Sequence, residues 1–133
     1  MAKMITKLEK NEVFVFGSNE SGIHGGGAAL QACKSFGAKW NKGFGFHFTP
    51  MGRTFAIPTK DWNINSLTLD IIELYVYRFI EYTKTRDDLV FLVTEIGCGL
   101  AGYTPEDIAP MFEFALNRSN IVLPERFIKI LKK

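Results

Sequence analysis

The segment VFVFGSNESGIHGGGAAL, residues 13–30, carries the signals of a buried strand, a glycine-rich loop and a helix start. Residues 13–16 are apolar and rich in β-formers, which predicts a strand in the core. Residues 17–27 are polar and contain five glycines, and the alanines and leucine that follow are strong helix formers. This order directs backbone N–H groups and a helix N-terminus toward one point, which attracts an anion, usually a phosphate. The alternative to an anion-binding loop is a flexible connector without a ligand, but a strand and a helix flank this loop.

The composition is that of one globular domain spanning residues 1–133, with 47% apolar and 23% charged residues. The formal net charge is +2 and the basic residues are scattered, so a nucleic-acid partner is not indicated. Two cysteines without metal-ligand spacing predict a reducing compartment and no bound metal. Without a signal-peptide core or a membrane-spanning apolar run, we expect a cytoplasmic protein with no membrane partner. The oligomeric state is left open, a monomer included.

Strand and helix signals alternate along the whole chain. The expected strands are residues 4–8, 13–16, 43–48, 53–58, 89–94 and 120–123, and the expected helices are residues 26–36, 67–82, 105–117 and 125–132. The strand at residues 89–94 is continuously apolar, which is typical of a strand buried on both faces of a sheet. The alternation predicts an α/β fold, a three-layer α/β/α sandwich around a mixed, mostly parallel sheet.

A second glycine-rich loop, GCGLAG at residues 97–102, also follows an apolar strand and precedes a helix. Both loops therefore leave the carboxyl ends of strands, the sheet edge at which α/β proteins bind ligands. Two anion-binding loops at one edge suit a diphosphate better than a single phosphate. Polar side chains suited to sugar hydroxyls are Ser18, Asn19 and Ser21, and aromatic candidates for stacking on a base or ribose are Phe44, Phe46, Trp62 and Tyr103. The expected partner is a small-molecule nucleotide or nucleotide sugar.

Two familiar nucleotide motifs fit the chain only in part. Residues 97–102 match the pattern Gly-x-Gly-x-x-Gly, but the region about 20 residues further on, where that fold needs a strand with an acidic residue, reads NIVL at residues 120–123. No second half of a dinucleotide-binding domain remains either. Ile23 and His24 stand where a P-loop requires lysine and serine or threonine. The sequence therefore argues against both a dehydrogenase and a P-loop NTPase.

The chain resembles the macro-domain superfamily, whose α/β/α fold binds ADP-ribose. It is most similar to a small divergent branch of uncharacterised phage and bacterial proteins. The residues that carry the resemblance are FGSN at 16–19, GGGAA at 25–29, AIPTKD at 56–61 and IGCGLAGYTPEDIAP at 96–110. They occur in the family's order and span roughly residues 13–124.

The resemblance implies roles for particular residues. Asn19 is similar to the asparagine that contacts the distal ribose, and residues 25–27 to the glycine run beside that ribose. Residues 97–103 are similar to the diphosphate-binding loop, with Tyr103 at a frequent stacking position. The expected ligand-binding residues are Gly17, Ser18, Asn19, Gly25, Gly26, Gly27, Thr59, Asp61, Gly97, Cys98, Gly99, Leu100, Ala101, Gly102 and Tyr103. No separate cofactor is expected.

The chain also departs from the family pattern at two positions that bear on function. Ala29 occupies the position at which de-ADP-ribosylating macro domains commonly carry an aspartate, and the early aspartate that holds adenine has no clear counterpart. The first hypothesis is therefore a module that binds ADP-ribose or a related NAD-derived nucleotide.

A hydrolase is the alternative hypothesis, so the sequence leaves open whether the chain is an enzyme. It would act on an ADP-ribosyl derivative or an ADP-ribose phosphate, with His24 as general base and Asn19 beside it. A Cys98–His24 hydrolase is a further variant, for which Cys98 would need a lowered thiol pKa. A purely structural or protein-interaction role leaves the two glycine loops unexplained.

Overall fold

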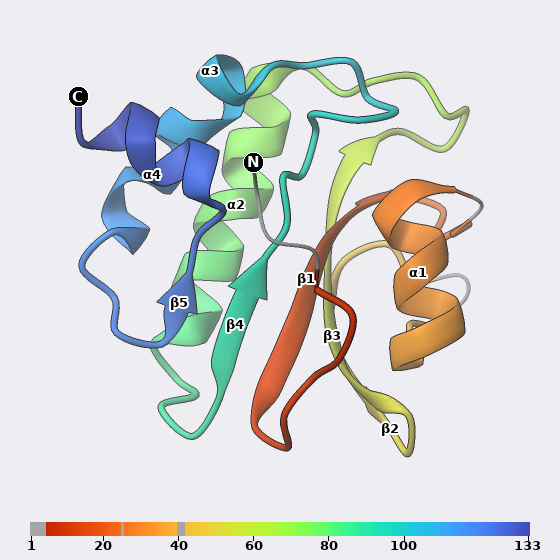
Figure 1. The fold of residues 1–133 in the computed structure, drawn as a ribbon. Coiled ribbons are helices and arrows are strands. Elements are labelled where there is room, and N and C mark those ends of the chain that lie inside the picture. Colours follow the sequence, from red (N-terminus) through yellow and green to blue (C-terminus); the bar gives the residue numbers. More distant parts are fainter. Residues whose placement is uncertain (1–4, 25, 40–41) are drawn as a thin grey trace.

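The central sheet has five strands in the order β2-β3-β1-β4-β5 (Figure 1). The computed structural model describes residues 5–24, 26–39 and 42–133. The strands are β1 (Glu12–Asn19), β2 (Gly45–Thr49), β3 (Gly52–Lys60), β4 (Val90–Val93) and β5 (Ile121–Val122). The helices are α1 (Gly27–Phe36), α2 (Leu69–Thr83), α3 (Pro105–Ile108) and α4 (Glu125–Leu131), with the 3₁₀ helix η1 (Ala109–Ala115) between α3 and α4.

The sheet is mixed and mostly parallel, as the alternation of strands and helices predicted. β1 pairs in parallel with both β3 and β4, and β4 pairs in parallel with β5. Only the β2–β3 pair, at one edge of the described sheet, is antiparallel. The carboxyl ends of β1, β3 and β4 therefore meet at the same edge, the upper edge in Figure 1.

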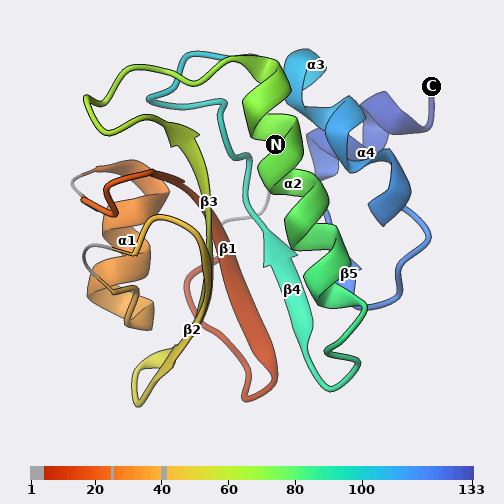
Figure 2. The ribbon, with the colours of Figure 1, turned by 180° about the vertical axis from the view of Figure 1, so that it is seen from behind.

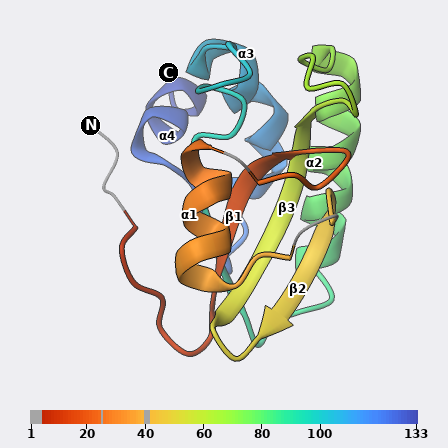
Figure 3. The same ribbon diagram turned by 90° about the vertical axis from the view of Figure 1, so that its right-hand side faces the viewer.

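The alternation of side chains along β1 builds two cores, one on each face of the sheet. Val13 and Val15 are buried in the larger core, which α2, η1 and α4 help to form. Phe14 and Phe16 point to the opposite face and are buried with the small residues of α1. Figures 2 and 3 show α1 and α2 on opposite sides of the sheet, which confirms the three-layer arrangement. Burying each of these phenylalanines contributes roughly 1.5–3 kcal/mol.

The helix after the first loop ends at Phe36, as predicted. Its run of alanines favours a helix and leaves room for the phenylalanines of β1 beneath it. Gly37 follows with φ 79°, a left-handed conformation that glycine adopts without steric cost.

Strand β1 is longer than the sequence predicted. The expected strand ended at Phe16, whereas the structure continues it to Asn19. The reason is its partner: Gly17 pairs with Ile57, and the pairing with β3 continues to the end of both strands. The first loop therefore begins at Glu20, and the expectation that Gly17 starts it is wrong.

The predicted helix at residues 105–117 is divided into α3 and η1. Thr104 and Asp107 form a capping box at its start, in agreement with the helix-start signal. Pro110 then interrupts the α-helix because it lacks an N–H group and its ring clashes with the carbonyl of the preceding turn. The chain continues as a 3₁₀ helix to Ala115.

The chain before β1 does not form the edge strand that was expected at residues 4–8. Residues 5–8 have no regular structure, and Met4 lies outside the described residues. In residues 38–52, β2 pairs with β3, and Phe44 and Phe46 pack against the larger core. No helix in the described ranges is long and apolar enough to cross a lipid bilayer.

Candidate functional site

A pocket of about 740 Å³ opens at the carboxyl edge of β1, β3 and β4, where the two glycine-rich loops meet. It is lined by backbone and small side chains from both loops, with a few polar groups between them. The lining residues are Gly17, Ser18, Asn19, Ile23, Gly26, Gly27, Ala28, Ala29, Thr59, Lys60, Ile64, Thr94, Glu95, Ile96, Gly97, Cys98, Gly99, Leu100 and Ala101. The structure thus brings the two predicted loops to one cavity.

The N-terminus of α1 forms one wall of this pocket. Gly26 is the N-cap of the helix and makes no side-chain capping hydrogen bond. The first-turn residues Gly27, Ala28 and Ala29 line the cavity. First-turn N–H groups have no partner within a helix, and the helix dipole adds partial positive charge at this end. This wall therefore suits an anionic group.

The polar side chains at the end of β1 mainly hold the first loop in place. Asn19 donates from Nδ2 to the Ile23 carbonyl (2.7 Å), and its Oδ1 accepts from Ser21 Oγ (2.7 Å) and Ile23 N (2.9 Å). Ser18 donates to the Gly43 carbonyl. Asn19 and Ser18 still line the pocket, but most of the hydrogen-bonding capacity of Asn19 is used within the loop.

His24 is buried in the smaller core and does not line the pocket. Its side chain is 0% exposed, and its Nε2–H donates to the Lys39 carbonyl at 2.7 Å. The ring meets Phe16 edge to face, with 5.3 Å between centroids. Burial lowers the pKa of His24 below its usual range, although the hydrogen bond to Lys39 opposes this. This placement contradicts the expectation that His24 faces a ligand as general base.

The second glycine loop is a backbone turn that leaves open space above it. Gly102 N donates to Gly99 O (3.0 Å) and Tyr103 N donates to Gly97 O (2.9 Å). Gly97 has φ +76°, and a Cβ added there would lie 2.9 Å from Ile108 Cδ1. A Cβ added at Gly99 would meet no atom within 4 Å. The loop thus exposes its backbone at Gly99 while Gly97 fixes it against α3.

Tyr103 lies behind this loop. Its hydroxyl donates to the Leu67 carbonyl at 2.5 Å, its ring packs against the larger core, and it does not line the pocket. The other stacking candidates also lie elsewhere: Phe44 and Phe46 pack against the core, and Trp62 is 70% exposed outside the lining. The predicted aromatic stacking side chains are therefore not in the pocket wall.

The turn after β3 contributes an aliphatic residue that the sequence did not suggest. Asp61 Oδ1 accepts hydrogen bonds from Asn63 N (2.8 Å) and Asn65 N (3.0 Å), so Asp61 stabilises this turn and does not line the pocket. Ile64 has φ 63°, an unusual backbone conformation for a β-branched residue, and it lines the pocket. Ser66 Oγ donates to the Ala101 carbonyl (2.6 Å), which links this turn to the second glycine loop.

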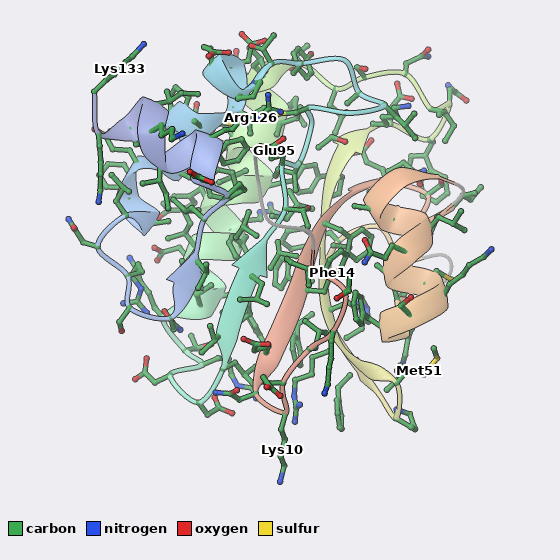
Figure 4. The ribbon with its side chains drawn as sticks, viewed as in Figure 1. Lys10, Phe14, Met51, Glu95, Arg126 and Lys133 are labelled. Atoms are coloured by element: carbon green, nitrogen blue, oxygen red, sulfur yellow. The ribbon has the colours of Figure 1, made fainter. Side chains whose placement is uncertain are left out.

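Two charged residues, Lys60 and Glu95, are among the lining residues. Arg126 on α4 donates to Glu95 from Nε (2.7 Å) and Nη2 (2.5 Å), and these bonds hold the pKa of the carboxyl below its usual range (Figure 4). Burial and the nearby Glu95 raise the pKa of Cys98 to about 11. Cys98 is therefore a thiol at neutral pH, and the lowered pKa expected for a nucleophile is wrong.

Solved structures with similar folds include the following two. Thermosipho africanus DarTG in complex with ADP-ribose matches with a TM-score of 0.58 over 84% of this chain at 18% identity. The match covers 36% of the DarTG chain, so this chain corresponds to about a third of that protein. A protein of unknown function from Bacteroides thetaiotaomicron matches with a TM-score of 0.64 and 15% identity, covering 89% of this chain and 88% of that one. No family model and no curated protein matches the sequence.

This chain has a macro-domain-like fold. The resemblance noted in the sequence is confirmed at the level of the fold. The DarTG structure contains bound ADP-ribose.

The predicted site residues fall into three groups. Those that line the pocket are Gly17, Ser18, Asn19, Gly26, Gly27, Thr59, Gly97, Cys98, Gly99, Leu100 and Ala101. Asp61, Gly102, Tyr103 and His24 do not line it. Gly25 lies outside the described residues.

Eight lining residues were not among the predicted ligand-binding residues: Ile23, Ala28, Ala29, Lys60, Ile64, Thr94, Glu95 and Ile96. Most of them directly adjoin a predicted motif. Thr94, Glu95 and Ile96 follow β4 immediately, and their position after a buried parallel strand was the available signal.

Proposed function

We propose that this chain binds ADP-ribose or a related nucleotide diphosphate in the pocket between its two glycine-rich loops. The observation that carries the proposal is that both loops line one cavity at the carboxyl edge of the parallel strands. In α/β sheets this edge is where ligands bind. The proposed role is recognition or sequestration of the nucleotide.

The electrostatics of the cavity support a phosphate-containing ligand. The uncapped N-terminus of α1 offers backbone donors and partial positive charge on one side. On the other side, the open backbone at Gly99 lets phosphate oxygens approach closely. Lys60, which also lines the cavity, supplies a cation. Together these groups offset part of the charge of a diphosphate.

The size of the cavity and the fold comparison support a ligand of nucleotide-sugar dimensions. A volume of about 740 Å³ lies within the 300–1,000 Å³ that is usual for small-molecule sites. The DarTG structure, with ADP-ribose bound, shares the fold at a TM-score of 0.58. AMP alone would occupy less of the cavity and would contact fewer of its polar groups.

The test is isothermal titration calorimetry of the protein with ADP-ribose, AMP and NAD. We expect micromolar binding of ADP-ribose and much weaker binding of AMP. Absence of heat with ADP-ribose would refute the proposed ligand. Incubation of the protein with an ADP-ribose phosphate for several hours, followed by chromatography, then separates a binding module from a hydrolase, because only a hydrolase converts this compound to ADP-ribose.

A further inference from the structure

Glu95 is an acidic residue of the pocket wall, and phosphate binding does not explain its presence there. Glu95 lines the cavity and its side chain is 20% exposed. The two hydrogen bonds from Arg126 keep its pKa low, so the group is ionised at neutral pH. A carboxylate and a phosphate repel each other at short distance. Glu95 must therefore face a part of the ligand other than its diphosphate, or no ligand at all.

The geometry of the ion pair fixes this carboxylate. Nε of Arg126 donates to Oε2 and Nη2 donates to Oε1, so the guanidinium engages both oxygens in a two-pronged arrangement. The Arg126 side chain is 51% exposed, which places it on the more open side of the pair. Figure 4 shows the two residues close together beyond the end of β4. Such a pair loses less side-chain entropy on ligand binding than a free glutamate would.

Each carboxylate oxygen has two acceptor sites, and Arg126 occupies one on each. The remaining sites accept hydrogen bonds from hydroxyl or amino groups. In a nucleotide sugar, such donors occur on the ribose rings and on the base, away from the diphosphate. The negative charge of Glu95 also acts on the second loop, because its electrostatic interaction with Cys98 helps to raise the pKa of that thiol.

We propose that Glu95, held by Arg126, is a specificity-determining residue that accepts hydrogen bonds from the hydroxyl or amino end of the ligand. The inference rests on the proposed function, because it concerns the same pocket. In this arrangement the carboxylate attracts the donor-rich end of the ligand and repels its phosphates. This attraction and this repulsion together set the direction in which a nucleotide sugar binds.

The experiment compares ADP-ribose affinity, by calorimetry, for wild type, Glu95→Gln, Arg126→Met and Glu125→Gln. Glu95→Gln removes the charge while it retains the shape, and we expect at least about tenfold weaker binding, typical of losing a hydrogen bond to a charged group. Arg126→Met leaves the Glu95 carboxylate itself intact, so we expect a loss of affinity several-fold smaller than that of Glu95→Gln. Glu125→Gln removes a surface ion pair with Lys129 on the same helix and should bind as wild type.

The outcomes separate this inference from the proposed function. If wild type does not bind ADP-ribose, the proposed function fails. If wild type binds and Glu95→Gln binds equally well, only the role of Glu95 fails. Equal losses in Glu95→Gln and Arg126→Met would show that the pair merely attaches α4, which also overturns the inference. Thermal unfolding of each variant identifies any loss that is due to misfolding.

Discussion

The two glycine-rich loops occupy the same sheet edge but are stabilised in different ways. The first loop is held by side chains: Asn19 bonds to Ile23 and Ser21, and His24 is buried beneath it. The second loop is held mainly by its own backbone hydrogen bonds, and a side chain added at Gly99 would extend into open space. Both have the sequence pattern of strand, glycine loop and helix, yet their polar and small residues serve different purposes.

The difference indicates which substitutions act on the fold and which act on the ligand. In the first loop, polar side chains are internal supports, so removing them should reduce stability. In the second loop, Gly99 has no neighbour to disturb, so a new side chain there should reduce binding alone. Three predictions, from the largest expected effect to the smallest, test this contrast.

Gly99→Val should weaken ADP-ribose binding at least about 100-fold, equivalent to about 2.7 kcal/mol, with an unchanged unfolding temperature. The branched side chain would occupy the space that phosphate oxygens need, while no protein atom lies within 4 Å of the new Cβ. Gly97→Ala is the matched control: its positive φ and its contact with Ile108 should lower the unfolding temperature. A folded Gly99→Val protein with wild-type affinity would refute the role of this loop.

Asn19→Ala should lower the free energy of unfolding by roughly 1–3 kcal/mol, because it removes three hydrogen bonds in a largely buried loop. Asp61→Ala also removes two hydrogen bonds to backbone, but from an exposed turn, so we expect a loss below about 1 kcal/mol. Urea unfolding measures both. Equal losses would mean that the first loop depends no more on its side chains than an exposed turn does.

Acidification should destabilise the protein through His24. Its pKa is lowered from 6.5 in the folded state, so the unfolded chain takes up a proton first and the free energy of unfolding falls as the pH drops below about 6.5. One such proton contributes at most about 1.4 kcal/mol per pH unit. Urea unfolding of wild type and His24→Gln between pH 7 and pH 5 should show a shallower decrease for the variant.

His47→Gln is the control for this pH dependence. The pKa of His47 is also lowered, by burial and then by the charges of Lys39 and Lys42, but its side chain is more exposed than that of His24. We therefore expect His47→Gln to change the slope less than His24→Gln does. A slope in His24→Gln identical to that of wild type would show that the first loop is not anchored through a neutral imidazole.

Much of the fold could be predicted from local patterns. Apolar runs correctly predicted the strands β1, β3 and β4, and an apolar stripe predicted the helix α2. The glycine after α1 correctly predicted the end of that helix. Two errors arose where a partner strand or a single residue overrode the local pattern. Pairing with β3 lengthened β1 to Asn19, and Pro110 converted the end of a predicted helix into η1.

The sequence by itself determined that two glycine loops follow two buried strands, because strand, glycine and helix preferences act over short stretches. Only the tertiary structure decided where each side chain points. It placed His24 in the core and Tyr103 behind its loop, and it brought Arg126 to Glu95. Such contacts depend on elements far apart in the chain, and burial, rather than residue type, decides whether a polar group meets a ligand or the protein itself.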